Sequence, residues 1–151
     1  AANPMVLGYH DLMVHDYGPG RQFASMHVEM DHRADPLVCH EIIDDMEREC
    51  YESHGIQLVI HYDPVVVDDP ELTALRERVR ALVREFDPSL NIHDFRMVRG
   101  ERHTNLIFDV SMPAALSDKQ QELTRRLTEK MNENSPMRYC LVITYDLADY
   151  A

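Results

Sequence analysis

The sequence predicts an α+β fold in which one small unit occurs twice in tandem. Two pairs of matching segments support this prediction. HDLMV at residues 10–14 resembles HDFRMV at residues 93–98, and VIHYD at residues 59–63 resembles VITYD at residues 142–146. Both pairs are separated by 83 positions, since 93 − 10 and 142 − 59 give the same difference. Two matches at one offset indicate an internal duplication.

The first copy is expected to contain three strands and one helix. Strands are predicted at residues 9–16 and 21–30, on either side of a Gly-Pro-Gly turn at residues 18–20. A helix is predicted at residues 36–53, and a strand rich in β-branched side chains at residues 56–62.

The second copy is expected to open with a helix at residues 70–86. Asp69 can cap this helix, and Pro70 suits its first position. Its apolar face is formed by Leu72, Leu75, Val79, Leu82, Val83 and Phe86. The same offset places the corresponding helix of the first copy before residue 1. We therefore expect the chain to come from a longer protein.

The rest of the second copy is predicted to be two strands, a helix and a strand. The strands are expected at residues 91–98 and 104–112. Ser117 is expected to cap the next helix, with Gln120 as its capping-box partner. The last strand is predicted at residues 138–145.

This element order predicts the ferredoxin-like, metallochaperone-like class of α/β sandwich. We divide the chain into residues 1–67, a first repeat that lacks its opening helix, and residues 68–151, a complete second repeat. No apolar run approaches the roughly 20 residues that a membrane-spanning helix needs. The three cysteines show no CxxC spacing and are expected to be reduced and mostly buried.

The negative charge and the histidines are concentrated in the first repeat. Residues 1–68 carry 3 basic and 13 acidic side chains, a net charge of −10, whereas residues 69–151 carry 12 and 14, a net charge of −2. Seven of the nine histidines lie within residues 1–68. This charge argues against binding to nucleic acid or anionic membrane surfaces. An acidic, histidine-rich segment is instead suited to binding cations.

Comparison of the two copies identifies candidate metal ligands. His27, His40 and His61 have no histidine at the matching positions of the second copy, whereas His10 and Asp63 are matched by a histidine and an aspartate. Residues that the fold required would be expected in both copies. Neutral imidazoles together with a carboxylate suit borderline divalent metals such as Zn²⁺. The candidate ligands are His10, His27, His40, His61 and Asp63, and Asp44 is expected to orient His40.

The motifs HDL, YGPGRQFASMHVEM, CHEIIDDMERE and GIQLVIHYDP occur in this order within residues 8–66. Together they closely resemble the cytoplasmic C-terminal domain of cation diffusion facilitator transporters. In that family the corresponding histidines and aspartate bind two or more divalent cations near a homodimer interface, and the domain follows a six-helix membrane domain.

The resemblance therefore implies a homodimeric, metal-sensing regulatory domain on the cytoplasmic side of the membrane. It implies His10, His27, His40, His61 and Asp63 as ligands of Zn²⁺ or of Fe²⁺, Mn²⁺, Co²⁺ or Ni²⁺. It also implies the N-terminal membrane domain of the same protein as a partner, and no enzymatic activity.

The remaining histidines are expected to have other roles. His15, His32 and His54 fall outside the matched motifs and are expected at the surface. In the second copy His93, His103, Asp109 and Asp146 are the available donors, and for them we expect a structural or dimerising role ahead of metal binding.

Two other classes of function are compatible with parts of this pattern. A binuclear metallohydrolase also gathers histidine and aspartate, but it needs a cleft, an open coordination position and usually a general base. A dimerising or small-molecule-binding regulatory module without metal is the other class, since fold does not determine function. Titration with Zn²⁺ distinguishes a metal sensor from these two classes. A sensor binds Zn²⁺ without catalysing a reaction, a hydrolase cleaves an ester or amide, and a purely dimerising module does not bind Zn²⁺.

Overall fold

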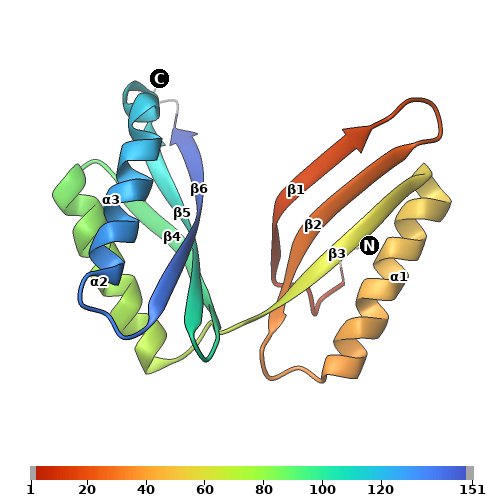
Figure 1. The fold of residues 1–151 in the computed structure, drawn as a ribbon, viewed down its shortest axis with the longest axis horizontal. Coiled ribbons are helices and arrows are strands. Elements are labelled where there is room, and N and C mark those ends of the chain that lie inside the picture. Colours follow the sequence, from red (N-terminus) through yellow and green to blue (C-terminus); the bar gives the residue numbers. More distant parts are fainter. Residues whose placement is uncertain (1–2, 149–151) are drawn as a thin grey trace. The chain divides into compact units, whose positions relative to one another are not determined.

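The structure, a computed structural model, describes residues 3–148. It contains two compact units, Ala1–Val65 and Val66–Ala151, each with its own three-stranded sheet (Figure 1). The boundary lies two residues before the predicted one, because Val66 is buried in the second core and exchanges two backbone hydrogen bonds with Met97. No helix within the described residues is both long and apolar enough to cross a membrane.

The first unit is a mixed sheet covered by a single helix. Its elements are β1 (Gly8–Asp16), β2 (Gln22–Asp31), α1 (Pro36–His54) and β3 (Ile56–Val65). The sheet order is β1-β2-β3, with β1 antiparallel and β3 parallel to β2. As Figure 1 shows, α1 packs on one face of this sheet. The core beneath α1 contains Val28, Met30, Cys39, Ile43 and Ile60.

Local signals define both ends of α1. The Asp35 side chain accepts hydrogen bonds from the backbone N–H groups of Leu37 and Val38, and Pro36 occupies the first turn. Gly55 ends the helix in the left-handed conformation, with φ of 66°, which glycine adopts without steric cost. These signals explain why the predicted helix at residues 36–53 agrees with the observed one to within one residue.

The second unit has the same sheet with two helices on one face. Its elements are α2 (Pro70–Phe86), β4 (Asn91–Arg99), β5 (His103–Pro113), the short 3₁₀ helix η1 (Ala114–Lys119), α3 (Gln120–Asn132) and β6 (Arg138–Ala148). The order β4-β5-β6 is again antiparallel and then parallel. In Figure 1, α2 and α3 lie side by side against this sheet. The predicted tandem ferredoxin-like α+β class is confirmed.

The predicted capping box at Ser117 is wrong. The chain turns into η1 directly after Pro113, so Ser117 lies inside a 3₁₀ segment instead of in the extended conformation of an N-cap. α3 begins at Gln120 and has no side-chain cap. The Asp69 cap of α2 is confirmed, because its carboxylate accepts from the N–H of Glu71.

The duplication is also visible in an irregular feature of the backbone. β1 has a register shift between His10 and Met13, and β4 has one between His93 and Arg96. Within each shift a single aspartate, Asp11 or Asp94, has a positive φ of 53°. Such a conformation is uncommon for residues other than glycine, and aspartate is among those that tolerate it best. Both repeats therefore share the same bulge at the same position.

The cap of α1 provides a test of the first unit. Asp35→Ala removes the acceptor for two backbone N–H groups and is expected to lower the free energy of unfolding by about 1 kcal/mol. The matched control is Asp45→Ala on the exposed middle of α1, which is expected to change it by less than about 0.5 kcal/mol. Urea denaturation followed by circular dichroism measures both, and equal losses in the two variants would contradict the capping role.

Candidate metal centre

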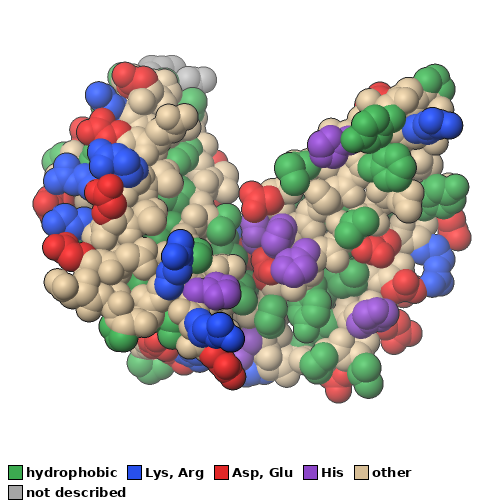
Figure 2. Space-filling view, viewed as in Figure 1, with side chains coloured by type: hydrophobic (Ala, Val, Ile, Leu, Met, Phe, Trp, Pro, Cys, Tyr) green, Lys and Arg blue, Asp and Glu red, His purple; other side chains and the backbone are tan. Residues whose placement is uncertain are grey.

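The alternation of side chains along the strands divides the first sheet into two faces. On β2, Val28 and Met30 face α1, so the intervening His27 and Glu29 project from the opposite face. His61 and Asp63 alternate in the same way on β3, beside the core residue Ile60. The polar residues of the first unit therefore collect on the face that α1 leaves open. Figure 2 shows histidine side chains gathered beside acidic ones on this unit.

His10, His27 and Asp63 form the centre of this group. Their potential ligand atoms all lie within 4.8 Å of one another. Asp63 Oδ2 is 3.1 Å from His27 Nδ1 and 3.4 Å from His10 Nε2. The two imidazole rings stack with their centroids 4.8 Å apart. Ligand atoms about 2.0–2.1 Å from a zinc ion lie roughly 3.4 Å from each other in a tetrahedron, so small adjustments suffice to enclose a metal.

His61 lies at the outer edge of the same group. Its Nδ1 atom is 3.2 Å from His27 Nδ1 and 3.5 Å from Asp63 Oδ1. The His61 side chain is 74% exposed, whereas those of His10 and Asp63 are 6% and 8% exposed. The group thus runs from a buried end at His10 to an open end at His61, where further ligands could enter.

Glu29 is a further candidate for a role at this site, as a carboxylate behind the predicted ligands. It is buried, and its Oε1 atom is 2.9 Å from His10 Nδ1. When Nδ1 carries the proton, it donates to Glu29 and leaves Nε2 free to face Asp63. Gly8 pairs with Glu29 across the strands, and a methyl group at Gly8 would lie 3.1 Å from Glu29 Oε2. Glycine therefore leaves room for the carboxylate. The signal for Glu29 was its position two residues after His27 on one strand.

His40 does not join the other four predicted ligands within one chain. It is exposed on α1, next to the buried Cys39, and α1 covers the face of the sheet opposite to the histidine group. Asp44, which could have oriented His40, accepts a hydrogen bond from Arg48 instead. His40 could reach a metal either directly from its own helix or through a metal shared with a partner chain, and the position of α1 leaves only the second of these. A contribution from His40 requires a second chain.

A shallow hollow of about 400 Å³ borders the histidine group. His27 and His61 line it together with residues of the bulged strand β1. Its apolar lining residues are Leu12, Met13, Met26 and Val59. Three of these, Leu12, Met13 and Val59, are more than half exposed. The donor atoms therefore lie next to an apolar surface that water covers in the single chain.

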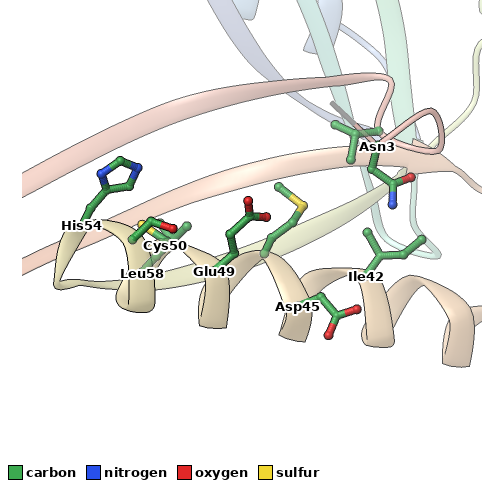
Figure 3. A pocket seen from close by; sticks show the side chains of 10 residues that line it. Asn3, Ile42, Asp45, Glu49, Cys50, His54 and Leu58 are labelled. Atoms are coloured by element: carbon green, nitrogen blue, oxygen red, sulfur yellow. The ribbon is translucent and has the colours of Figure 1, made fainter. Parts of the chain in front are cut away.

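A second hollow, of about 510 Å³, lies along α1 between the helix and the N-terminal residues. Figure 3 shows side chains from successive turns of α1 beside it, from Ile42 to His54, with Leu58 of β3. The titratable groups here are Asp45, Glu49, Cys50 and His54. Among the residues that the structure describes, they do not form a group of three closely spaced metal donors.

In the second unit, His93, Asp109 and Asp146 also have donor atoms within 4.8 Å of one another. His103 stands apart from this group at the exposed first residue of β5. Burial raises the pKa of Asp109, while the nearby charges of Arg96 and His93 oppose that shift. The three other histidines, His15, His32 and His54, are exposed as predicted.

Comparison with known families identifies the unit that carries the histidine group. Residues 1–65 match the sequence model of the cation efflux protein cytoplasmic domain. The first unit matches this family model over its whole length. The match ends at the boundary between the two units, so the second unit lies outside it. No curated protein and no solved structure matches the chain.

The match to the cation efflux cytoplasmic domain covers the histidine group. The matched segment contains all five predicted ligands and Glu29. The predicted resemblance is confirmed for this unit.

Glu29 provides a test of the arrangement behind the ligands. Glu29→Gln keeps the size of the side chain but removes the charge that orients His10, and we expect Zn²⁺ affinity to fall about 10–100-fold. Glu49→Gln, on α1 and away from the open face, is the matched control. Competition with a chromophoric chelator measures both affinities. Wild-type affinity in Glu29→Gln would show that this carboxylate does not support the site.

Proposed function

We propose that the chain is the metal-sensing regulatory part of a divalent cation efflux transporter, acting through a homodimer on the cytoplasmic side of the membrane. The observation that carries this proposal is the convergence of His10, His27 and Asp63 on the open sheet face of a cation efflux cytoplasmic domain. His61 extends the group toward solvent. In the transporter, the state of this group would report the cation level.

The donors favour a borderline divalent cation. Imidazole nitrogen suits Zn²⁺, Fe²⁺, Co²⁺ and Ni²⁺, and a carboxylate adds Mn²⁺ to the metals that can bind. Asp63 offers Oδ2 toward His10 and His27, and Oδ1 toward His61. One carboxylate could therefore bridge two ions, one at the buried end of the group and one at its exposed end.

A second chain would complete the site and cover the apolar surface beside it. β1 exposes Leu12, Met13 and Val14 in succession, each more than half accessible, and Val59 lies across the hollow from them. Contiguous exposed apolar side chains of this kind mark interaction surfaces. Such a partner could also supply His40, whose own chain holds it away from the ligands.

Charge explains how metal could control the dimer. With a net charge of −10 over residues 1–68, two copies repel each other at close range. Divalent cations bound where the copies meet neutralise part of this charge, so they bind the closed dimer better than the open one. Only such differential affinity shifts a conformational equilibrium, and coupling of about 1–3 kcal/mol is typical.

The coupling between metal and dimer geometry can be measured directly. Spin labels on the two protomers are expected to approach each other when Zn²⁺ is added, with a narrower distance distribution by double electron–electron resonance. A variant with His10→Ala and Asp63→Asn is the control and should not respond. An unchanged distribution with Zn²⁺ bound would leave a constitutive dimer that metal merely stabilises.

Protons should compete with metal at this site. Imidazoles bind metals only when neutral, and the free side chain has a pKa of about 6.5, so Zn²⁺ affinity should fall as the pH drops below that range. Isothermal titration at pH 7.5 and 5.5 measures the change. Because several imidazoles contribute, the loss of Zn²⁺ affinity between these two pH values should exceed the loss at a site made of carboxylates alone. An affinity that does not change with pH would exclude histidine ligands.

A further inference from the structure

We propose that the second unit holds a divalent-cation site of its own, formed by His93, Asp109 and Asp146 and suited to harder cations of the Mn²⁺ class. The family match ends at residue 65, so it does not assign this site. The proposal stands independently of the sensing function proposed for the first unit, because it concerns other residues on another sheet.

The three side chains have the spacing of metal ligands. His93 Nε2 is 3.1 Å from Asp146 Oδ2, and His93 Nδ1 is 3.7 Å from Asp109 Oδ2. One ligand atom from each of the three residues lies within 4.8 Å of the others. Asp146 and Asp109 face different nitrogens of His93, and an imidazole binds one ion through one nitrogen, so the side chains of His93 or Asp109 must rotate before all three residues share an ion at about 2.0–2.2 Å. All three residues project from the face of the sheet opposite to α2 and α3, since Phe108 and Val110, on either side of Asp109, lie in the core.

The strand pairing places these residues at the positions of the first metal group. His10 pairs with His27 across the antiparallel strands of the first unit, and His93 pairs with Asp109 in the second. Across the parallel strands, Glu29 pairs with Asp63, and Ser111 pairs with Asp146. His10, His27 and Asp63 thus correspond one by one to His93, Asp109 and Asp146. An accidental grouping of charged surface residues would not be expected to occupy the same three positions of the sheet in both units.

The bulge supplies a group that can orient the histidine. Asp94 has the same left-handed conformation as Asp11, and its Oδ2 atom is 3.2 Å from His93 Nδ1. In the first unit the corresponding contact to His10 Nδ1 comes from Glu29, whose counterpart is Ser111. Asp94 can therefore accept a hydrogen bond from His93 Nδ1 and leave Nε2 free toward Asp146.

The change of ligands determines which cations the site prefers. Asp109 replaces His27, and Thr144 stands at the ladder position of His61, so one imidazole and two carboxylates replace an imidazole-rich group. Carboxylate and water ligands suit Mn²⁺ and other hard cations, whereas imidazole favours Zn²⁺ and its neighbours. Asp146 is exposed, so water can complete the coordination.

Arg96 is the feature of this site that opposes a cation. It occupies the position of Met13 after the bulge, its Nη1 atom donates to the backbone oxygen of Asp94, and the same atom is 3.9 Å from Asp109 Oδ1. A guanidinium at this distance lowers the attraction of the carboxylates for a metal. Arg96→Met, which restores the residue of the first unit, should therefore strengthen cation binding.

Mn²⁺ titration of the 151-residue chain tests this site, with free Mn²⁺ followed by its electron paramagnetic resonance signal. The background is His10→Ala with Asp63→Asn, which disables the first group. One bound Mn²⁺ per chain is expected there. We expect His93→Ala or Asp146→Asn to weaken this binding at least 10-fold, and Arg96→Met to strengthen it several-fold. His103→Ala, on the same unit but outside the group, is the control and should leave the affinity unchanged.

The outcomes separate this site from the first one. Mn²⁺ binding that is lost in the His10→Ala, Asp63→Asn background, or that survives both His93→Ala and Asp146→Asn there, would overturn the proposal. Circular dichroism of each variant verifies that the sheet is intact, and Asp146→Asn, at an exposed position, serves if His93→Ala fails to fold. Failure of the first unit to bind Zn²⁺ would leave these expectations intact.

Discussion

The two-residue period of the strands is the constraint on which both candidate metal groups depend. Each sheet is covered by helices on one face only, so residues that alternate with the core must project from the other face. Val28 and Met30 pack under α1, and His27 and Glu29 are thereby directed away from it. The same packing that stabilises the unit also sets the direction of its metal donors, and a shift of one residue in β2 would bury the histidine and expose the core.

The sequence predicted the elements well where local chemistry is strong. α1 and α2 have an aspartate cap followed by proline, and Gly55 closes α1, so both helices were located to within a residue. The helix start predicted at Ser117 was wrong because a serine is a weaker signal than an aspartate followed by proline. Serine also occurs within turns, and here the chain enters the 3₁₀ helix η1 directly after Pro113. The donors His27 and His61 followed from internal comparison, because the second copy has no histidine at either position, whereas His10 and Asp63 occur in both copies and were singled out by the resemblance to the family.

Other features of the site could not be predicted from the sequence because they depend on pairing between distant strands. The position of His40 depends on which face of the sheet α1 covers and on which side of that helix packs into the core, where Cys39 and Ile43 lie. The offset of 83 aligns His27 with Val110, whereas the ladder pairs His93 with Asp109, one residue earlier. The connection between β4 and β5 is shorter than that between β1 and β2, which accounts for the displaced match. Because of this change in hairpin length, the offset alone does not align Asp109 with His27, although Asp109 was among the donors predicted for the second copy.

The parallel pairing of β2 and β3 limits how the first unit can respond to its ligand. The ladder runs without interruption from Gln22–Ile56 to Asp31–Val65, so His27, His61 and Asp63 are carried by two strands that cannot slide independently. The donors are consequently preorganised, and filling the site needs little more than rotation of side chains. Under the proposed function, a metal bound here would be held by one continuous ladder, so the two strands would respond to it together and not by sliding past each other.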